Sequence, residues 1–318
     1  MLLLYLILFR LVLFLEPVTF QPPETANLLS NFSYRGFSSL ATNRNWVYHV
    51  VSILLIFLQA LYFNYLVNFY RILSKSSYLA AFSYILVSSL FVEFTLLTSA
   101  LMANTFLLIA IGRIFSLYKK EGATAIVFDA AWWVSIASLF FFPYILFFVF
   151  VIAAITVLRP FNVREYFLAA IGLLLPYYFM GVYFFWIDKL PEFLQSLIIS
   201  ELRFNTEVLE RSSRILVMGI PLGAVILWTA LFIQANLFRM VVQVRNYLIV
   251  IVWFFIAGIL SLLVQFKGDL SHFIWLTVPA GISFAFFFAE FRKRLVSEIL
   301  HFFIILAILF YQYFYLFN

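Results

Sequence analysis

The chain has 318 residues, of which 66% are hydrophobic and only 11% are charged, and its formal net charge is +6. A soluble domain carries about 25% charged residues, so this composition excludes an ordinary soluble protein and predicts that lipid is the solvent for much of the surface. The absence of cysteine excludes disulfides, thiolate metal sites and thiol nucleophiles. His49, His272 and His301 lie far apart in the sequence. We therefore expect no metal and no cofactor.

The predicted elements begin with a short apolar run at 2–15, which we interpret as a retained first span. Its Arg10 is expected either to extend toward the cytoplasmic surface or to pair with a carboxylate inside the bundle, and we favour the first. A polar segment at 16–46 follows. Further apolar runs lie at 47–70, 78–97, 100–118, 126–141, 143–158, 166–187, 215–237, 247–266, 272–289 and 298–317. Since a span needs about 20 apolar residues, the sequence predicts an all-α, polytopic transmembrane helical bundle of about eleven spans, formed as a single domain over 1–318.

Two features of this predicted bundle concern its connections. Residues 126–158, which contain Pro143, form either two short spans or one broken hairpin.

Every second span ends in a basic loop, and the basic residues of these loops are Arg71, Lys75, Arg113, Lys119, Lys120, Arg159, Arg164, Arg239, Arg245, Arg292, Lys293 and Arg294. The positive-inside rule places these loops in the cytoplasm, the N-terminus inside and the C-terminus outside. The positive charge is thus explained by topology, and we expect no nucleic-acid partner.

Two segments outside the spans are long enough to form structure, and both are predicted to be extracytoplasmic. The first is 16–46 and the second is 188–214. In the second, apolar residues recur at helical spacing; they include Phe193, Leu194, Leu197, Ile198 and Leu202. This spacing predicts an amphipathic helix in the outer interface, with its apolar face in the headgroup boundary.

The first outer segment holds the candidate chemical groups. Glu16 and Glu24 are the candidate catalytic carboxylates, because a carboxylate there can act as general base on a sugar hydroxyl or hold a divalent metal. Arg35, Arg44 and His49 are candidates for binding a substrate or its phosphate. The alternative is a solvated loop whose charges have no role. The basic loop 159–165 has two similar interpretations, a phosphate-headgroup site or a topological signal alone.

Polar and small residues inside the predicted spans are few. Gln59, Asn64, Asn68, Asn104 and Gln234 leave open a polar route through the bundle, which keeps a transporter among the hypotheses. The chain has only 10 glycines. We therefore expect that close packing through small residues is not the main contact between the helices.

Three stretches carry a resemblance to a known family. Residues 128–185, SYLAAFSYILVSSLFVEF (77–94) and HFIWLTVPAGISFAFFF (272–288) resemble the uncharacterised DUF6427 family of multi-spanning inner-membrane proteins in Bacteroidota. The likeness covers most of the chain and implies an inner-membrane location with no settled activity. The predicted topology is also similar to that of the GT-C glycosyltransferases, which implies an acidic catalytic residue soon after the first span. Glu16 and Glu24 are the matching positions, but the paired acidic residues of that family are absent.

These observations leave three hypotheses for a multi-pass protein of the inner (cytoplasmic) membrane. The first is a non-catalytic subunit or scaffold of an envelope-biogenesis or protein-export complex, with membrane lipid and other inner-membrane proteins as partners. The second is a GT-C-like glycosyltransferase that uses a polyprenyl-linked sugar donor at the extracytoplasmic face, which adds a polyprenyl-phosphate lipid to the partners. The third is a transporter.

Overall fold

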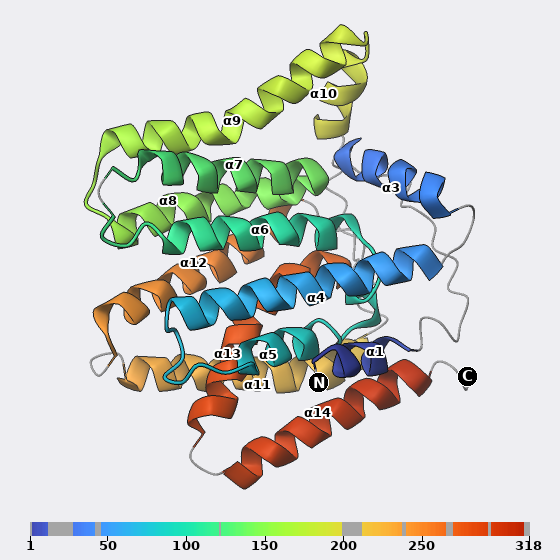
Figure 1. Cartoon of the computed structure of the whole chain (residues 1–318), viewed down its shortest axis with the longest axis vertical. Coiled ribbons are helices and arrows are strands. Elements are labelled where there is room, and N and C mark those ends of the chain that lie inside the picture. The colour runs from blue at the N-terminus through green and yellow to red at the C-terminus, as the bar shows by residue number, and fades with distance from the viewer. Residues whose placement is uncertain are drawn as a thin grey trace.

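The computed structural model describes residues 2–11, 28–41, 46–120, 122–198, 212–236, 240–264, 270–291 and 294–314. Throughout these residues the chain forms helices joined by turns and no strand, which confirms the all-α prediction (Figure 1). The helices are α1 (Leu2–Arg10), α3 (Leu28–Ala41), α4 (Trp46–Phe69), α5 (Leu79–Val87), η1 (Val92–Phe94), α6 (Ser99–Phe115), α7 (Thr124–Phe140), η2 (Phe142–Leu146), α8 (Phe147–Leu158), α9 (Val163–Trp186), α10 (Leu190–Ile198), α11 (Ser212–Asn236), α12 (Val242–Val264), η5 (Leu270–Leu276), α13 (Thr277–Glu290) and α14 (Arg294–Phe314).

Four helical segments of the described chain are long and apolar enough to cross a membrane: Trp46–Phe69, Val163–Trp186, Val242–Val264 and Leu270–Glu290. Shorter apolar helices lie at Ser99–Phe115, Thr124–Phe140, Phe142–Leu158, Leu222–Asn236 and Ser297–Phe310. A helix that crosses the hydrocarbon core, which is about 30 Å thick, needs about 20 residues. These are the properties of a membrane-embedded helical protein.

Large apolar side chains lie on the outside of the bundle as well as in its core. On α4 the exposed side chains include Leu54, Leu58 and Tyr65, and on α14 they include Phe302 and Phe303. A soluble protein would bury such helix faces, whereas lipid leaves them in an apolar solvent. The exposed faces therefore agree with the membrane assignment.

Residues 126–158 form two helices, α7 and α8, which are separated near Pro143 and contact each other. Helix α7 ends at Phe140, and η2 begins with Phe142 and Pro143 before α8 continues from Phe147. Proline lacks the amide hydrogen that a helix interior needs, but it suits a first helical turn. Pro143 therefore marks the start of the second helix.

The described connections α4–α5, α6–α7 and α8–α9, which hold most of the basic residues outside the helices, lie at one end of the bundle, on the left of Figure 1, together with the end of α13. Ser74, between α4 and α5, donates a 2.6 Å hydrogen bond from Oγ to Oε1 of Glu290. Arg159 donates to the backbone oxygen of Lys120, which joins the α8–α9 connection to the α6–α7 connection. We call this the basic end; its described basic residues are Arg71, Lys75, Arg113, Lys119, Lys120, Arg159, Arg164 and Arg245. Helix α3 and the junction of α9 with α10 lie at the opposite end.

Helices α7 and α9 pack through small residues. A Cβ atom added at Gly172 would lie 2.6 Å from the backbone oxygen of Phe128, so the two helix backbones nearly touch there. Beside this contact, Ser135 Oγ donates a 2.7 Å hydrogen bond to the backbone oxygen of Leu173. Close packing through a small residue therefore does occur at this crossing, where one glycine is enough; whether such contacts are the main ones between the helices stays a prediction.

Replacing Gly172 with alanine is expected to lower the free energy of unfolding by about 1–3 kcal/mol, since a new methyl group would force two backbones apart. Gly181→Ala on the same helix is the matched control, because its Cβ would meet only a ring carbon of Phe193 at 3.9 Å. Thermal unfolding of both variants in one detergent measures the difference. Equal stability of the two variants would contradict close packing at Gly172.

Candidate functional site

The chain between α5 and α6, residues 88–98, is mostly buried and is irregular backbone apart from the short helix η1. Side chains from four helices hydrogen-bond to its backbone oxygens: Arg10 to Ser88 (3.4 Å) and Thr95 (3.3 Å), Ser52 to Thr95 (2.6 Å), Tyr34 to Leu97 (3.1 Å) and Gln312 to Ser89 (3.0 Å). In lipid, irregular backbone is tolerated only where protein satisfies its polar groups. These side chains from α1, α4, α3 and α14 do so.

Arg10 is fully buried, with 0% of its surface exposed. Its Nη1 also donates a 3.2 Å hydrogen bond to Ser52 Oγ. No carboxylate of the described residues forms an ion pair with it. The expectation that Arg10 extends to the surface is wrong, because α1 packs against α4, α5 and α14 and places its last residue inside the bundle.

The candidate residues of the first outer segment do not form one described site. Arg35 is exposed on α3, whereas His49 is buried in α4 with 3% of its surface exposed. Glu16, Glu24 and Arg44 lie outside the described residues. A catalytic role for this segment therefore stays a prediction.

A second buried polar network joins four helices in the middle of the bundle. Tyr84 Oη donates to Gln59 Oε1 at 2.7 Å, and Asn104 Nδ2 donates to Tyr84 Oη at 2.9 Å. Asn104 also donates to Thr277 Oγ1 at 3.3 Å, and Gln59 Nε2 donates to Thr105 Oγ1 at 2.7 Å. The network thus links α4, α5, α6 and α13. Such hydrogen bonds between helices stabilise a bundle in lipid.

The remaining residues of the predicted polar route do not continue this network. Asn64 Oδ1 accepts a 3.3 Å hydrogen bond from the backbone nitrogen of Ala81, and Asn68 Nδ2 donates a 3.0 Å bond to the backbone oxygen of Ser77. Gln234 is exposed on α11. The described residues therefore bring Gln59 and Asn104 together and leave the other three at separate places.

A groove of about 560 Å³ lies between α4 and α6. Its walls include Leu58, Tyr62, Tyr65, Leu108 and Ile109. Gln59 and Thr105 lie at one end, and Arg113 and Ser116 lie at the other, which belongs to the basic end. We call this the α4–α6 groove.

One end of the groove is charged, and a hydrogen bond holds Tyr70 in place at the same end. Arg113 Nε lies 3.8 Å from Asp129 Oδ2, and both side chains are about half exposed. Tyr70, just beyond α4, is half-buried; its burial raises the pKa of its phenol to about 12. The phenol therefore stays protonated at neutral pH, and it donates a 3.4 Å hydrogen bond to the backbone oxygen of Gly112. The charged and amide side chains of the groove thus lie at its ends, and its walls between them are aliphatic or aromatic.

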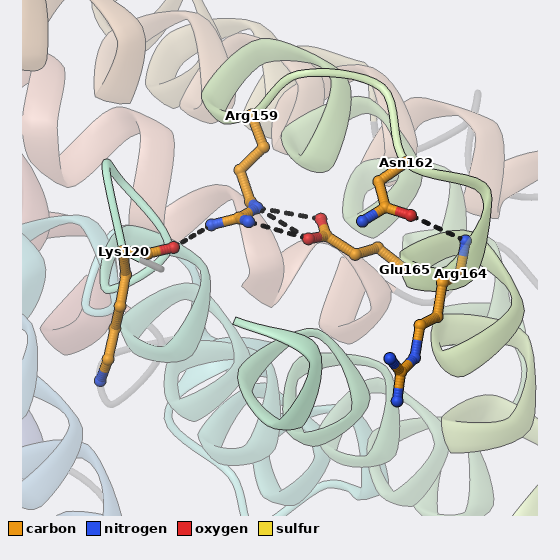
Figure 2. A network of polar contacts seen from close by, with 5 residues as sticks. All are labelled: Lys120, Arg159, Asn162, Arg164 and Glu165. Atoms are coloured by element: carbon orange, nitrogen blue, oxygen red, sulfur yellow. Dashed lines mark hydrogen bonds and ion pairs between the residues drawn. The ribbon is translucent and has the colours of Figure 1, made fainter. Parts of the chain in front are cut away.

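In the basic loop after α8, Arg159 is used internally, whereas Arg164 is exposed (Figure 2). Arg159 Nε lies 3.0 and 2.9 Å from the two carboxylate oxygens of Glu165, and its Nη1 donates to the backbone oxygen of Lys120. Glu165 is 1% exposed. Asn162 Oδ1 accepts a 3.1 Å bond from the backbone nitrogen of Arg164, which caps α9. Arg159 is therefore engaged in joining two connections and is not available to a phosphate headgroup.

No protein-family model, curated protein or solved structure matches this chain. The resemblances to the DUF6427 and GT-C families therefore stay predictions.

The predicted outer amphipathic helix corresponds in part to α10. Phe193 is 4% exposed and stacks on Phe184 of α9, with ring centroids 5.2 Å apart. Leu194 is 48% exposed. Phe193 is thus a contact between α9 and α10 and does not belong to an outward face. The side chains of Leu197 and Ile198, and all of Leu202, lie outside the described residues.

Sequence reasoning missed the α4–α6 groove and the role of Arg10. The available signal for the groove was a tyrosine series before Arg71, with Tyr62 and Tyr65 on α4 and Tyr70 just beyond it. Gly112 and Arg113 stand next to each other near the end of α6. Nothing local indicated that these two stretches face each other.

Proposed function

We propose that this chain is a multi-spanning inner-membrane protein that serves as a non-catalytic subunit or scaffold of an envelope-biogenesis or protein-export complex. In this proposal the chain crosses the membrane about eleven times, with the basic end in the cytoplasm, the N-terminus inside and the C-terminus outside. The four long apolar helices and the gathering of basic connections at one end support it.

The observation that carries the proposal is the outer end of α9. Helix α9 has 24 residues and α7 has 17, so at about 1.5 Å per residue α9 is longer by about 10 Å. Its last turns and α10 project from the bundle at the upper right of Figure 1. Tyr183, Phe185 and Trp186 are exposed there, and Trp186 is 85% exposed. We call residues 178–198 the α9–α10 arm.

An aromatic surface of this kind suits a protein partner. Tyrosine, tryptophan and phenylalanine are enriched at the centres of protein interfaces, and large exposed apolar patches mark interaction sites. Lipid headgroups also accept tyrosine and tryptophan, so the occupant has to be tested. The stack of Phe184 on Phe193 fixes α10 against α9 and gives the arm a defined shape.

The test compares two triple variants of the full chain. Tyr183→Ala/Phe185→Ala/Trp186→Ala removes the arm surface, and Phe302→Ala/Phe303→Ala/Leu306→Ala removes an equally apolar exposed surface on α14. Each is cross-linked in cells and purified in mild detergent. We expect the wild type and the α14 variant to bring down the same inner-membrane proteins and the arm variant to lose them. A solitary wild-type monomer, or partners retained by both variants, would contradict the proposal.

A GT-C-like transferase is the second candidate, and one observation favours it. Residues 28–41 of the first outer segment form a helix, and Tyr34 attaches it to the bundle through the backbone oxygen of Leu97 at 3.1 Å. Arg35 is exposed beside this anchor. The transferase requires that Glu16→Gln or Glu24→Gln abolish complementation of a deletion strain. Full complementation by both variants would reject it.

A further inference from the structure

The α4–α6 groove is about as long as one leaflet of a bilayer. It extends along α6 from Thr105 to Ser116, a rise of about 16 Å, and half of the hydrocarbon core is about 15 Å. Leu58 and Tyr65, on its α4 wall, are each 55% exposed. The groove therefore opens sideways from the bundle, into the region that lipid occupies.

The shape of the groove is built into the two helices. A Cβ atom at Gly112 would lie 2.3 Å from Tyr62 Oη, so only glycine lets this tyrosine lie against α6. The Tyr70 bond to the same residue closes the groove at the basic end. Between the two ends the walls are apolar or aromatic, as an extended hydrocarbon chain requires.

The charged end of the groove fits a phosphate. Within the described residues, the only ion pair or hydrogen bond of the Arg113 guanidinium is its 3.8 Å contact with Asp129. That contact is long and half-exposed, and such pairs contribute little free energy. A guanidinium binds phosphate through paired N–H donors. Lys119 and Lys120, a short distance along the same connection, add positive charge.

We propose that the α4–α6 groove binds one acyl chain of an anionic phospholipid and that Arg113 contacts its phosphate. Anionic lipids are attracted to basic juxtamembrane segments and bind in basic pockets between helices on the cytoplasmic side. The groove holds the chain between α4 and α6, and the headgroup lies at the basic end. Only the choice of the cytoplasmic leaflet rests on the proposed orientation.

The test is lipid binding to the purified full chain, measured by native mass spectrometry with phosphatidylglycerol and with phosphatidylcholine. We expect the wild type to prefer phosphatidylglycerol and Arg113→Gln to weaken that binding at least about tenfold. Ile109→Trp fills the groove and is expected to weaken the binding of both lipids. Lys75→Gln, an exposed charge at the basic end outside the groove, and Leu54→Trp, an exposed position on α4 outside it, are the controls and should bind as the wild type does.

Two results would overturn the inference. Equal binding of the two lipids by the wild type would contradict a preference for an anionic lipid, and equal losses in Arg113→Gln and Lys75→Gln would indicate diffuse attraction to the basic end in place of a contact of Arg113 with the phosphate. Thermal unfolding in detergent identifies any variant that fails to fold; Arg113→Lys then replaces Arg113→Gln, and Ile109→Phe replaces Ile109→Trp. Because the measurement uses detergent and none of the arm residues, its outcome is independent of the scaffold proposal.

Discussion

Replacing Arg10 with alanine is expected to lower the free energy of unfolding by about 2–4 kcal/mol. The variant loses the donors to the backbone oxygens of Ser88 and Thr95, and it leaves a cavity where a fully buried side chain lay. Ser52 still donates to Thr95, so Ser88 is the acceptor left without a partner. The change in free energy of unfolding is measured by titration with a denaturing detergent, with helix content followed by circular dichroism.

Two further variants define what Arg10 contributes. Arg10→Lys keeps the charge, but an ammonium lacks the planar fork that reaches Ser52, Thr95 and Ser88 together, so an intermediate loss is expected. Arg71→Ala removes an exposed arginine at the basic end and should change little. Wild-type stability of Arg10→Ala would show that residues 88–98 do not depend on this side chain.

Replacing Glu165 with alanine is expected to cost about 3 kcal/mol, because it leaves the Arg159 guanidinium partly buried without its carboxylate. The side chain of Arg159 is 16% exposed and that of Glu165 is 2% exposed. The Arg159→Met/Glu165→Ala double variant removes both charges. Its loss in free energy of unfolding should therefore be smaller than the sum of the losses in the two single variants. Strictly additive losses, measured by the same unfolding method, would contradict a coupled pair.

Composition and loop charge predicted the class of the protein and the end at which its basic residues gather. Both signals are local, since each helix carries its own apolar residues and each connection its own arginine or lysine. The break after α7 was also visible in the sequence as Pro143. These features depend on short stretches of chain.

The end of α5 shows what the sequence does not contain. The apolar run continues to residue 97, yet the helix ends at Val87 and irregular backbone follows. What stabilises that backbone are donors far away in the chain: Arg10 is 85 residues from Thr95, and Gln312 is 223 residues from Ser89. Hydropathy cannot report such contacts, so the break and the burial of Arg10 were missed together.

Glycine is a second example of a residue whose contacts the sequence does not reveal. The total of 10 glycines suggested that small residues are not the main contact between the helices, but the effect of a glycine depends on its place at a crossing. Gly172 lies against the Phe128 backbone, whereas a Cβ at Gly223 would meet nothing within 4 Å. The partner helix decides between these cases, and the sequence of one helix does not name its partner.

The most direct test of a membrane-spanning bundle is to measure which side of the membrane each end of it faces. The chain suits cysteine labelling because it contains no cysteine. Single cysteines are introduced at Lys75 and Lys120 of the basic end and at Arg35 and Asp188 of the opposite end, and right-side-out membrane vesicles are treated with a membrane-impermeant maleimide. We expect cysteines at Arg35 and Asp188 to be labelled in intact vesicles and those at Lys75 and Lys120 only after permeabilisation. Labelling of both ends in intact vesicles, or the reverse order, would contradict a membrane-spanning bundle with its basic end in the cytoplasm.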